Sequence, residues 1–415
     1  MQREDWRAYF AVMVRMGREQ AEKWVRGPVE KLWRTHVMGW NEAGQRLGRE
    51  LAGRLKGTWQ VAAARLSEAW VGLNRAQRSA TLAGTTAVAF FLLLALTGGS
   101  GSPAAKPLGK TGGPRFIAYF ENSGDAQAPG SFPGLQEHHA LIDTIMPLWF
   151  NVDAAGTVVN SQVDQTVDAY ASSHGINVEP MFINLGYYML TDPVTRENAA
   201  TNISGMVVKL GFAGADVDFE LLPPSVRADF SVFIQLLAAK MHKAGKVLSV
   251  TVFPKPGVSY SVTGSEDYPA LAKAADYLVL MAYDNHSNSS GPGPVAPLPW
   301  VRAGIRYALR EIPPAKLVLA VGQYGYDWDT STGITNYVST VGADQLAQAQ
   351  GVPIQWDAGQ GESHFQYGSH TVWFQNPRSL ALDLRLVQEY HLRGYALWRL
   401  GFETPGFWTQ VAKVK

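Results

Sequence analysis

Eight short apolar segments recur between residue 115 and the C-terminus, and this recurrence constrains the fold more than any other feature of the chain. They span 116–120, 144–152, 176–184, 215–220, 247–253, 277–283, 317–324 and 394–399. Helical patterns lie between several of them, for example at 224–244 and 300–310. Eight buried strands with helical crossovers favour an α/β fold, a (β/α)8 TIM barrel, over the alternative of a doubly wound open sheet.

The connection between the seventh and eighth segments is long and contains β-like pieces of its own. These pieces are 352–356, 364–367 and 371–374. Because long connections within a domain usually carry structure or function, we expect a small α+β insertion at about 328–376. Such an insertion could form one wall of a groove.

The N-terminal segment differs from the rest of the chain in charge. Residues 1–78 contain fifteen Lys and Arg against eight Asp and Glu, interleaved with six Trp, and their apolar spacing is helical. Residues 1–79 are therefore predicted to form a basic, Trp-rich helical region. Two interpretations stay open for it: a solvated helical hairpin, or a surface that lies on an anionic membrane leaflet.

An uncharged stretch follows at 79–105, with a strongly apolar centre. It predicts one transmembrane helix at 80–97, an uncleaved signal anchor, with a buried core helix as the alternative. Because the basic flank precedes the span, the positive-inside rule places residues 1–79 in the cytoplasm and the barrel, 114–415, outside the cell. Residues 98–113, rich in Gly, Ser, Pro and Lys, then form a flexible linker.

A row of acidic residues lies in the fourth apolar segment. In a strand, the period of two places Asp216, Asp218 and Glu220 on one face and Val217 and Phe219 on the other. The flanks are apolar, so the row is expected to be buried. Burial and mutual repulsion would raise the pKa of at least one carboxyl, which is costly for folding and indicates function.

Polar groups end three further segments: Tyr283 and Asp284 end the sixth, Tyr324 ends the seventh, and Trp398 ends the eighth. In a barrel the carboxyl ends of the strands surround the active site. A single Tyr or Trp at such a place could be rim packing, but convergence of four strand ends indicates a site.

Together these motifs resemble family 18 of the glycoside hydrolases. Residues 215–220 resemble its DGxDxDxE signature, 281–284 its MxYD motif, and Trp398 the tryptophan that closes strand eight. The runs at 218–224, 294–300, 325–328 and 372–380 are similar to the bacterial branch that includes spore-cortex and cell-wall N-acetylglucosaminidases. The first aspartate of the signature is replaced by Ala213.

The resemblance implies a role for each matching residue. Glu220 would be the general acid and later the base, Asp218 would orient the substrate's acetamide, and Tyr283 would donate a hydrogen bond to the acetamide oxygen. The other expected substrate-binding residues are Asp216, which would also tune Asp218, Asp284, Tyr324 and Trp398. The substrate would be peptidoglycan, hydrolysed after N-acetylglucosamine with retention of configuration, with a chitin-type glycan as the alternative.

Other functions are less well supported. The net charge of +1 gives no argument for nucleic acid, the absence of cysteine excludes thiolate metal sites, and the histidines show no metal-ligand spacing. We expect no metal and no cofactor. A silent glycan-binding protein is one alternative, motivated by Ala213, and a scaffold acting through residues 1–79 is another. The sequence does not predict an oligomeric state.

Overall fold

The computed structural model describes residues 113–122, 130–159 and 161–415. The chain divides into two units, 1–104 and 105–415, and the described residues all belong to the second. The predicted helical region at 1–79 and the predicted anchor at 80–97 lie outside the described residues, as does the linker except for residue 113. Among the helices that are described, none is long and apolar enough to cross a membrane.

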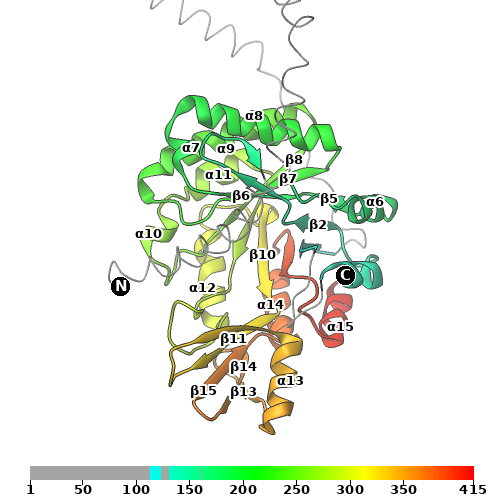
Figure 1. Ribbon diagram of the computed structural model, residues 1–415, viewed down its shortest axis with the longest axis vertical. Helices are drawn as coiled ribbons and strands as arrows, with labels where there is room; N and C mark the ends of the chain where they lie inside the picture. The colour runs from blue at the N-terminus through cyan, green and yellow to red at the C-terminus, as the bar shows by residue number, and fades with distance from the viewer. Residues whose placement is uncertain (1–112, 123–129, 160) are drawn as a thin grey trace, which may run out of the picture. The chain divides into compact units, whose positions relative to one another are not determined.

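A curled, mainly parallel sheet forms the centre of the unit (Figure 1). Its strands run in the order β4, β3, β6, β7, β8, β9, β10, β16, β1, β2, β5. Their bounds are β1 Arg115–Phe120, β2 Thr144–Pro147, β3 Phe150–Val152, β4 Val158–Val159, β5 Asn177–Val178, β6 Met181–Asn184, β7 Gly214–Asp218, β8 Val247–Val252, β9 Tyr277–Met281, β10 Leu317–Gly322 and β16 Gly394–Trp398.

The second and third predicted strands are each broken into two pieces, and these pieces bring the edges of the sheet together. β2 pairs with β1 and β5, whereas β3 pairs with β6, which continues to β7. The first break comes directly after Pro147, the last residue of β2. The second includes Pro180, which directly precedes β6. Proline has no N–H to donate to a neighbouring strand. Since each pair of pieces is continuous in the chain, the sheet curls back on itself. The structure confirms the prediction to the extent that the sheet is curled and barrel-like.

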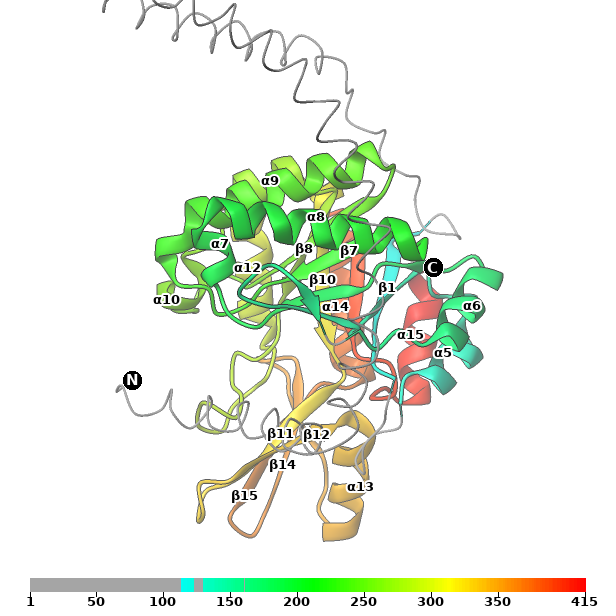
Figure 2. The same cartoon turned by 45° about the horizontal axis from the view of Figure 1, so that its top comes forward.

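Helices follow the strands and cover the outside of the sheet. The main ones are α5 Phe132–His138, α6 Gln165–Ser173, α8 Pro193–Leu210, α9 Arg227–Lys243, α11 Tyr268–Ala274, α12 Leu298–Ala308, α14 Pro377–Glu389 and α15 Pro405–Val414. Several begin where the sequence provides a cap: the side chains of Asp164, Asp192 and Asn376 each accept two backbone N–H groups of the first turn. Helices α8 and α9 pack side by side (Figure 2).

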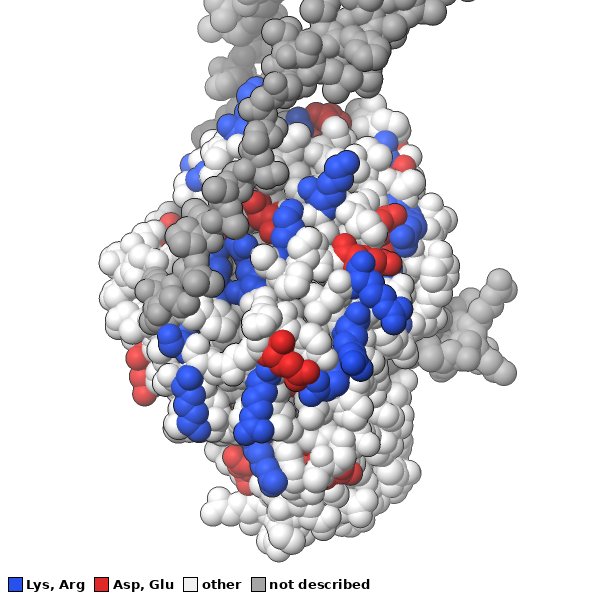
Figure 3. All heavy atoms as spheres, turned by 180° about the vertical axis from the view of Figure 1, so that it is seen from behind, with Lys and Arg blue, Asp and Glu red and all other residues white. Residues whose placement is uncertain are grey.

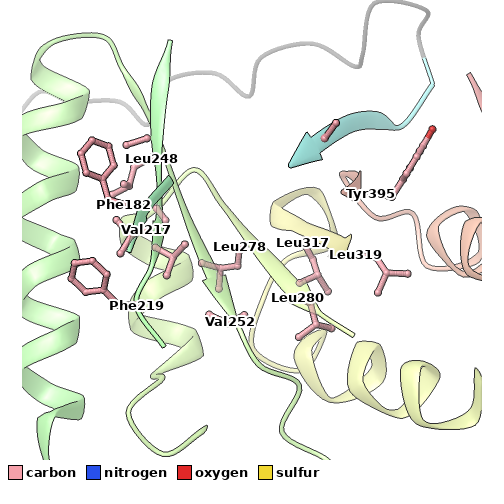
Figure 4. Close-up of a cluster of buried hydrophobic side chains, with 14 of the residues drawn as sticks. Phe182, Val217, Phe219, Leu248, Val252, Leu278, Leu280, Leu317, Leu319 and Tyr395 are labelled. Carbon is pink, nitrogen blue, oxygen red and sulfur yellow. The ribbon is translucent and has the colours of Figure 1, made fainter. Parts of the chain in front are cut away.

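The main core lies between the sheet and these helices. Figure 4 shows part of it, with Phe182, Val217 and Leu248 from neighbouring strands. A second, smaller cluster fills the inside of the curled sheet and includes Tyr119, Met146 and Met181. The sheet is therefore packed on both faces, as expected for parallel strands.

A second sheet is inserted between β10 and α14. It is antiparallel, in the order β12, β11, β15, β14, β13, and is packed against helix α13, Thr340–Gln350 (Figures 1 and 2). Its strands are β11 Tyr324–Asp329, β12 Thr335–Ser339, β13 Gln355–Asp357, β14 Glu362–Tyr367 and β15 His370–Phe374. The sheet starts at Tyr324, four residues before the predicted boundary, because the chain leaves β10 at Gly322.

Candidate active site

A cavity of about 160 Å³ opens where the carboxyl ends of the barrel strands meet the second sheet. Its lining residues are Tyr119, Asp218, Glu220, Thr251, Phe253, Met281, Tyr283, Asp284, Tyr324, Tyr326, Tyr337 and Trp398. Six of the seven predicted site residues are among them. The exception is Asp216, which is fully buried and does not line the cavity, so a direct contact with substrate is not supported for it.

A larger hollow, of about 300 Å³, lies on α12 and is lined by Arg302, Arg306 and Arg310. It contains no carboxylate and none of the predicted residues. Because acid catalysis needs a carboxyl group, the smaller cavity is the candidate active site.

Strand β7 positions the acid row through its alternation. Ala215, Val217 and Phe219 face the helices, where the ring of Phe219 stacks on that of Phe233 of α9 at 5.3 Å between centroids. Asp216 and Asp218 consequently face the inside of the barrel. The predicted two-faced strand thus accounts for the inward direction of these two carboxyls.

Two hydroxyl groups of β8 donate hydrogen bonds to the carboxyl group of Asp216. Ser249 donates to its Oδ1 at 2.6 Å and Thr251 donates to its Oδ2 at 2.9 Å, both from β8. The hydroxyl of Tyr119 lies 3.1 Å from that of Thr251. Burial raises the pKa of Asp216 to about 6, although the two hydrogen bonds act to lower it.

Asp218 and Glu220 share the cavity and oppose each other's ionisation. The pKa of Asp218 is raised well above its usual range, first by burial and then by the charges of Glu220 and Asp216. Its buried Oδ1 has no hydrogen-bond partner among the described residues. Burial, with a contribution from Asp284, raises the pKa of Glu220 to about 7. The pair therefore retains a proton near neutral pH, as a general acid requires.

The second sheet completes the wall opposite the acid row. Asp284 has a left-handed backbone, with φ of 61°, and its Oδ1 accepts hydrogen bonds from Tyr324 at 2.6 Å and from Tyr326 at 2.9 Å. Both tyrosines belong to β11. The insertion thus fixes the orientation of a carboxylate that belongs to the barrel.

Two aromatic side chains complete the cavity. Burial raises the pKa of Tyr283 well above its usual range, so its hydroxyl remains protonated and can donate a hydrogen bond. Trp398 ends β16 and its ring lies 5.2 Å from that of Tyr119. Its partly buried indole offers a flat apolar surface of the kind on which a sugar ring can rest.

Several lining residues were not predicted from the sequence: Tyr119, Thr251, Phe253, Met281, Tyr326 and Tyr337. Most of them lie at or just beyond the carboxyl ends of strands, so a survey of every strand end would have found Tyr119, Thr251 and Phe253. Tyr337 comes from β12 and carries no such signal. In the part of the chain that the structure describes, no group of three or more acidic or histidine side chains could hold a metal ion.

Comparisons with known proteins agree with this geometry. The family model described as Glycosyl hydrolases family 18 matches residues 115–403. A cortical fragment-lytic enzyme of Bacillus subtilis is 31% identical over 235 residues, which are 54% of this chain and 54% of that enzyme. This chain therefore spans about half the length of that relative.

Solved structures show the same fold. A chitinase from Chromobacterium violaceum matches with a TM-score of 0.67 and 28% identity, over 72% of this chain and 98% of that one. The spore cortex-lytic enzyme SleL of Bacillus megaterium matches with a TM-score of 0.66 and 24% identity, over 72% of this chain and 74% of that one.

Proposed function

Because this chain belongs to family 18 of the glycosyl hydrolases, we propose that it cleaves a β-linkage after N-acetylglucosamine in peptidoglycan, with Glu220 as the acid. The observation that carries the proposal is the cavity that Glu220 lines together with Asp218 and Tyr283. Burial there raises the pKa of Glu220 to about 7. An acid with that pKa is protonated in a substantial fraction of molecules at neutral pH. It can therefore protonate a leaving-group oxygen.

The first step proposed is substrate-assisted. Glu220 gives its proton to the glycosidic oxygen while the carbonyl oxygen of the substrate's own acetamide attacks the anomeric carbon, so that one C–O bond breaks and another forms. The proton that the pair retains is assigned to Glu220, so Asp218 is the carboxylate. Its Oδ1, which has no hydrogen-bond partner among the described residues, accepts a hydrogen bond from the acetamide N–H, and its charge balances the positive charge that develops on the group. The hydroxyl of Tyr283 donates to the acetamide oxygen and orients it.

The second step returns the enzyme to its starting state. Glu220, now a carboxylate, takes a proton from water, whose oxygen attacks the anomeric carbon and reopens the ring formed by the acetamide. Two inversions at this carbon give overall retention of configuration. Asp216 acts through Asp218, whereas Asp284, Tyr324 and Trp398 surround the sugar.

Ala213 does not weaken this assignment. It precedes β7, its N–H donates to the carbonyl oxygen of Val178 at 2.9 Å, and its side chain does not line the cavity. The acid and its partner residues are retained. A catalytically silent glycan-binding protein is thus less well supported than an active hydrolase.

Peptidoglycan is supported by the name of the B. subtilis relative, a cortical fragment-lytic enzyme. A chitin-type oligosaccharide is the second candidate, supported by the 28% identity to a chitinase over most of that enzyme. Both substrates carry the 2-acetamido group that the proposed mechanism needs. The choice between them requires a direct measurement.

Release of reducing ends from purified peptidoglycan and from chitin oligomers tests the proposal. We expect turnover of at least one substrate, and a loss of kcat on the order of 10³-fold or more for Glu220→Gln. Glu389→Gln is the matched control, since Glu389 is a surface residue paired with Arg302. Mass spectrometry of the products identifies the bond that is cut. Glycan binding without turnover, or a Glu220→Gln variant as active as wild type, would contradict the proposal.

We also propose that residues 80–97 anchor the enzyme in the cell membrane with the hydrolase outside. The support is the uncharged apolar stretch and the basic segment before it. We expect the full chain to sediment with membranes and a variant lacking 80–97 to remain in the supernatant. Protection of the hydrolase from added protease in intact cells would contradict the proposed orientation.

A further inference from the structure

Glu220 lies beyond the point where strand pairing stops. The parallel ladder between β6 and β7 ends with the pair Ile183 and Asp218, and the ladder between β7 and β8 ends with Val217 and Val250. Neither neighbouring strand therefore pairs with Glu220 through its backbone. Its own N–H and C=O need other partners, because unpaired backbone groups at a partly buried position are costly.

The side chain of Asn184 provides both partners. Its Oδ1 accepts the N–H of Glu220 at 2.9 Å, and its Nδ2 donates to the carbonyl oxygen of Glu220 at 3.1 Å. A primary amide has one acceptor and two donors, so it can replace the peptide group of a neighbouring strand. Asn184 is the last residue of β6, and its side chain thus extends the β6–β7 pairing past the end of the ladder.

The second hydrogen of Nδ2 has a partner in the loop that follows. Asn184 Nδ2 also lies 3.3 Å from the carbonyl oxygen of Gly186, whose φ of 140° is rarely adopted by other residues. One amide therefore connects the acid to the loop after β6. Only one of the two flipped orientations of the Asn184 amide makes these bonds. The N–H of Glu220 requires an acceptor, Oδ1, and the carbonyl oxygen of Glu220 requires a donor, Nδ2.

The backbone after Glu220 does not hold the acid in place by itself. Leu221 has φ of 55°, a left-handed conformation that is unfavourable for a residue with a side chain, and it is 43% exposed. A strained and exposed residue gives Glu220 little support from the C-terminal side. Support has to come from across the sheet, where Asn184 lies.

We propose that Asn184 is a positioning residue that fixes the backbone, and hence the carboxyl group, of Glu220 by taking the place of a neighbouring strand. This inference rests on the proposed role of Glu220 as the acid. Asn184 does not act on the sugar itself, so its loss should affect the chemical step more than substrate binding.

The test uses full-length Asn184→Leu and Asn184→Asp variants, assayed on the substrate that the wild-type enzyme cleaves. Leucine removes both hydrogen bonds, and we expect kcat to fall about 100-fold while KM changes less than about threefold, because misplacing a catalytic group by about 1 Å has an effect of that size. Thermal unfolding shows whether the variant is folded.

Asn184→Asp gives a signature that a merely structural role would not produce. When protonated, the introduced carboxyl has one donor and one acceptor and can make both bonds to Glu220; when ionised, it has no donor and repels the Glu220 carbonyl. The carbonyl oxygen of Glu220 faces the introduced group and disfavours its ionised form, so its pKa should lie above the ordinary value of about 3.9. We therefore expect kcat within about threefold of wild type near pH 5 and a loss of about tenfold or more near pH 7.5. The ratio to wild type removes the enzyme's own pH profile.

Asn202→Asp is the matched control, because Asn202 of α8 also donates to a backbone oxygen, that of Gly156 at 2.8 Å, away from the cavity. Its activity ratio should stay flat with pH. A flat ratio for folded Asn184→Asp, or a kcat of folded Asn184→Leu close to wild type, would overturn the inference while Glu220→Gln remained inactive. If Glu220→Gln were active, the proposed function would fail instead.

Discussion

At the scale of single residues, the proton on Glu220 depends on burial first and on the charge of Asp284 second. Asp284→Asn removes that charge and keeps an acceptor for Tyr324 and Tyr326. The pKa of Glu220 should then fall. Since the protonated form is active, the alkaline limb of kcat/KM should move to lower pH, and the ratio of variant to wild-type kcat/KM should decrease between pH 6 and 8.

The control for this prediction is Asp168→Asn on α6, where the carboxyl does not line the cavity. The alkaline limb of kcat/KM for this variant should coincide with that of wild type. An Asp284→Asn limb that stays in place or moves to higher pH would contradict the coupling between the two carboxyls.

Most of the candidate site could be predicted from the sequence because the signals are local. Asp218 and Glu220 lie on one strand, and Tyr283 and Asp284 are adjacent at the end of another. The missing residues depend on non-local structure. Tyr119 lines the cavity because the sheet curls, and Tyr337 because β12 pairs with β11 in register with Tyr326. No spacing in the sequence encodes either contact.

At the scale of elements, the eight apolar segments predicted every strand of the curled sheet except β4. What they could not predict was where the second and third would break, although Pro147 and Pro180 were visible as residues that interrupt a ladder. The insertion boundary was also placed too late. The run at 317–324 reads as one apolar strand, but the structure divides it between two sheets, since Gln323 separates β10 from β11.

Glu362, a buried acid of the inserted sheet, links that sheet to the barrel loop that follows β9. Glu362 of β14 accepts the N–H groups of Val295 at 2.7 Å and Ala296 at 2.9 Å, and the amide of Gln375 at 2.7 Å. Glu362→Ala leaves three buried donors without their acceptor. At about 1 kcal/mol or more each, we expect the free energy of unfolding in urea to fall by roughly 3 kcal/mol.

Glu389→Ala provides the comparison, because its partner Arg302 is at the surface and exposed pairs contribute about 0.5 kcal/mol. Glu362→Ala should also lower kcat/KM, since the inserted sheet carries Tyr324 and Tyr326. A stable variant with full activity would show that the insertion is held by other contacts.

At the scale of the whole molecule, charge is unevenly distributed. Residues 113–415 contain nineteen Lys and Arg and twenty-seven Asp and Glu, whereas residues 1–112 contain seventeen and eight. Even so, Figure 3 shows many basic side chains among fewer acidic ones on one face. Part of the reason is that several acids are buried: Asp143, Glu179, Asp216, Asp218, Glu266, Asp327, Glu362 and Asp383. Folding therefore changes the pKa values of these buried carboxyls.

Glu266 gives the sharpest test of this consequence. It is 4% exposed, its Oε1 accepts the N–H of Phe253 at 3.0 Å, its buried Oε2 has no partner among the described residues, and burial raises its pKa from 4.5 to about 8. Between those values the folded protein binds the proton and the unfolded chain releases it. The resulting stability is present below pH 4.5 and is lost as the pH rises through 8.

We therefore expect the free energy of unfolding of the wild-type protein to fall between pH 5 and pH 8, and that of Glu266→Gln to fall less, by on the order of 3 kcal/mol. Urea unfolding at constant ionic strength measures both slopes. Glu197→Gln, at an exposed residue paired with Lys240, should retain the wild-type slope. A constant difference in stability between glutamine and protonated glutamate does not affect the slope. Equal slopes for Glu266→Gln and wild type would mean that Glu266 is ionised in the folded enzyme, and the fall in stability would then have to come from the other buried carboxyls, such as the acid row, Glu362 and Asp383.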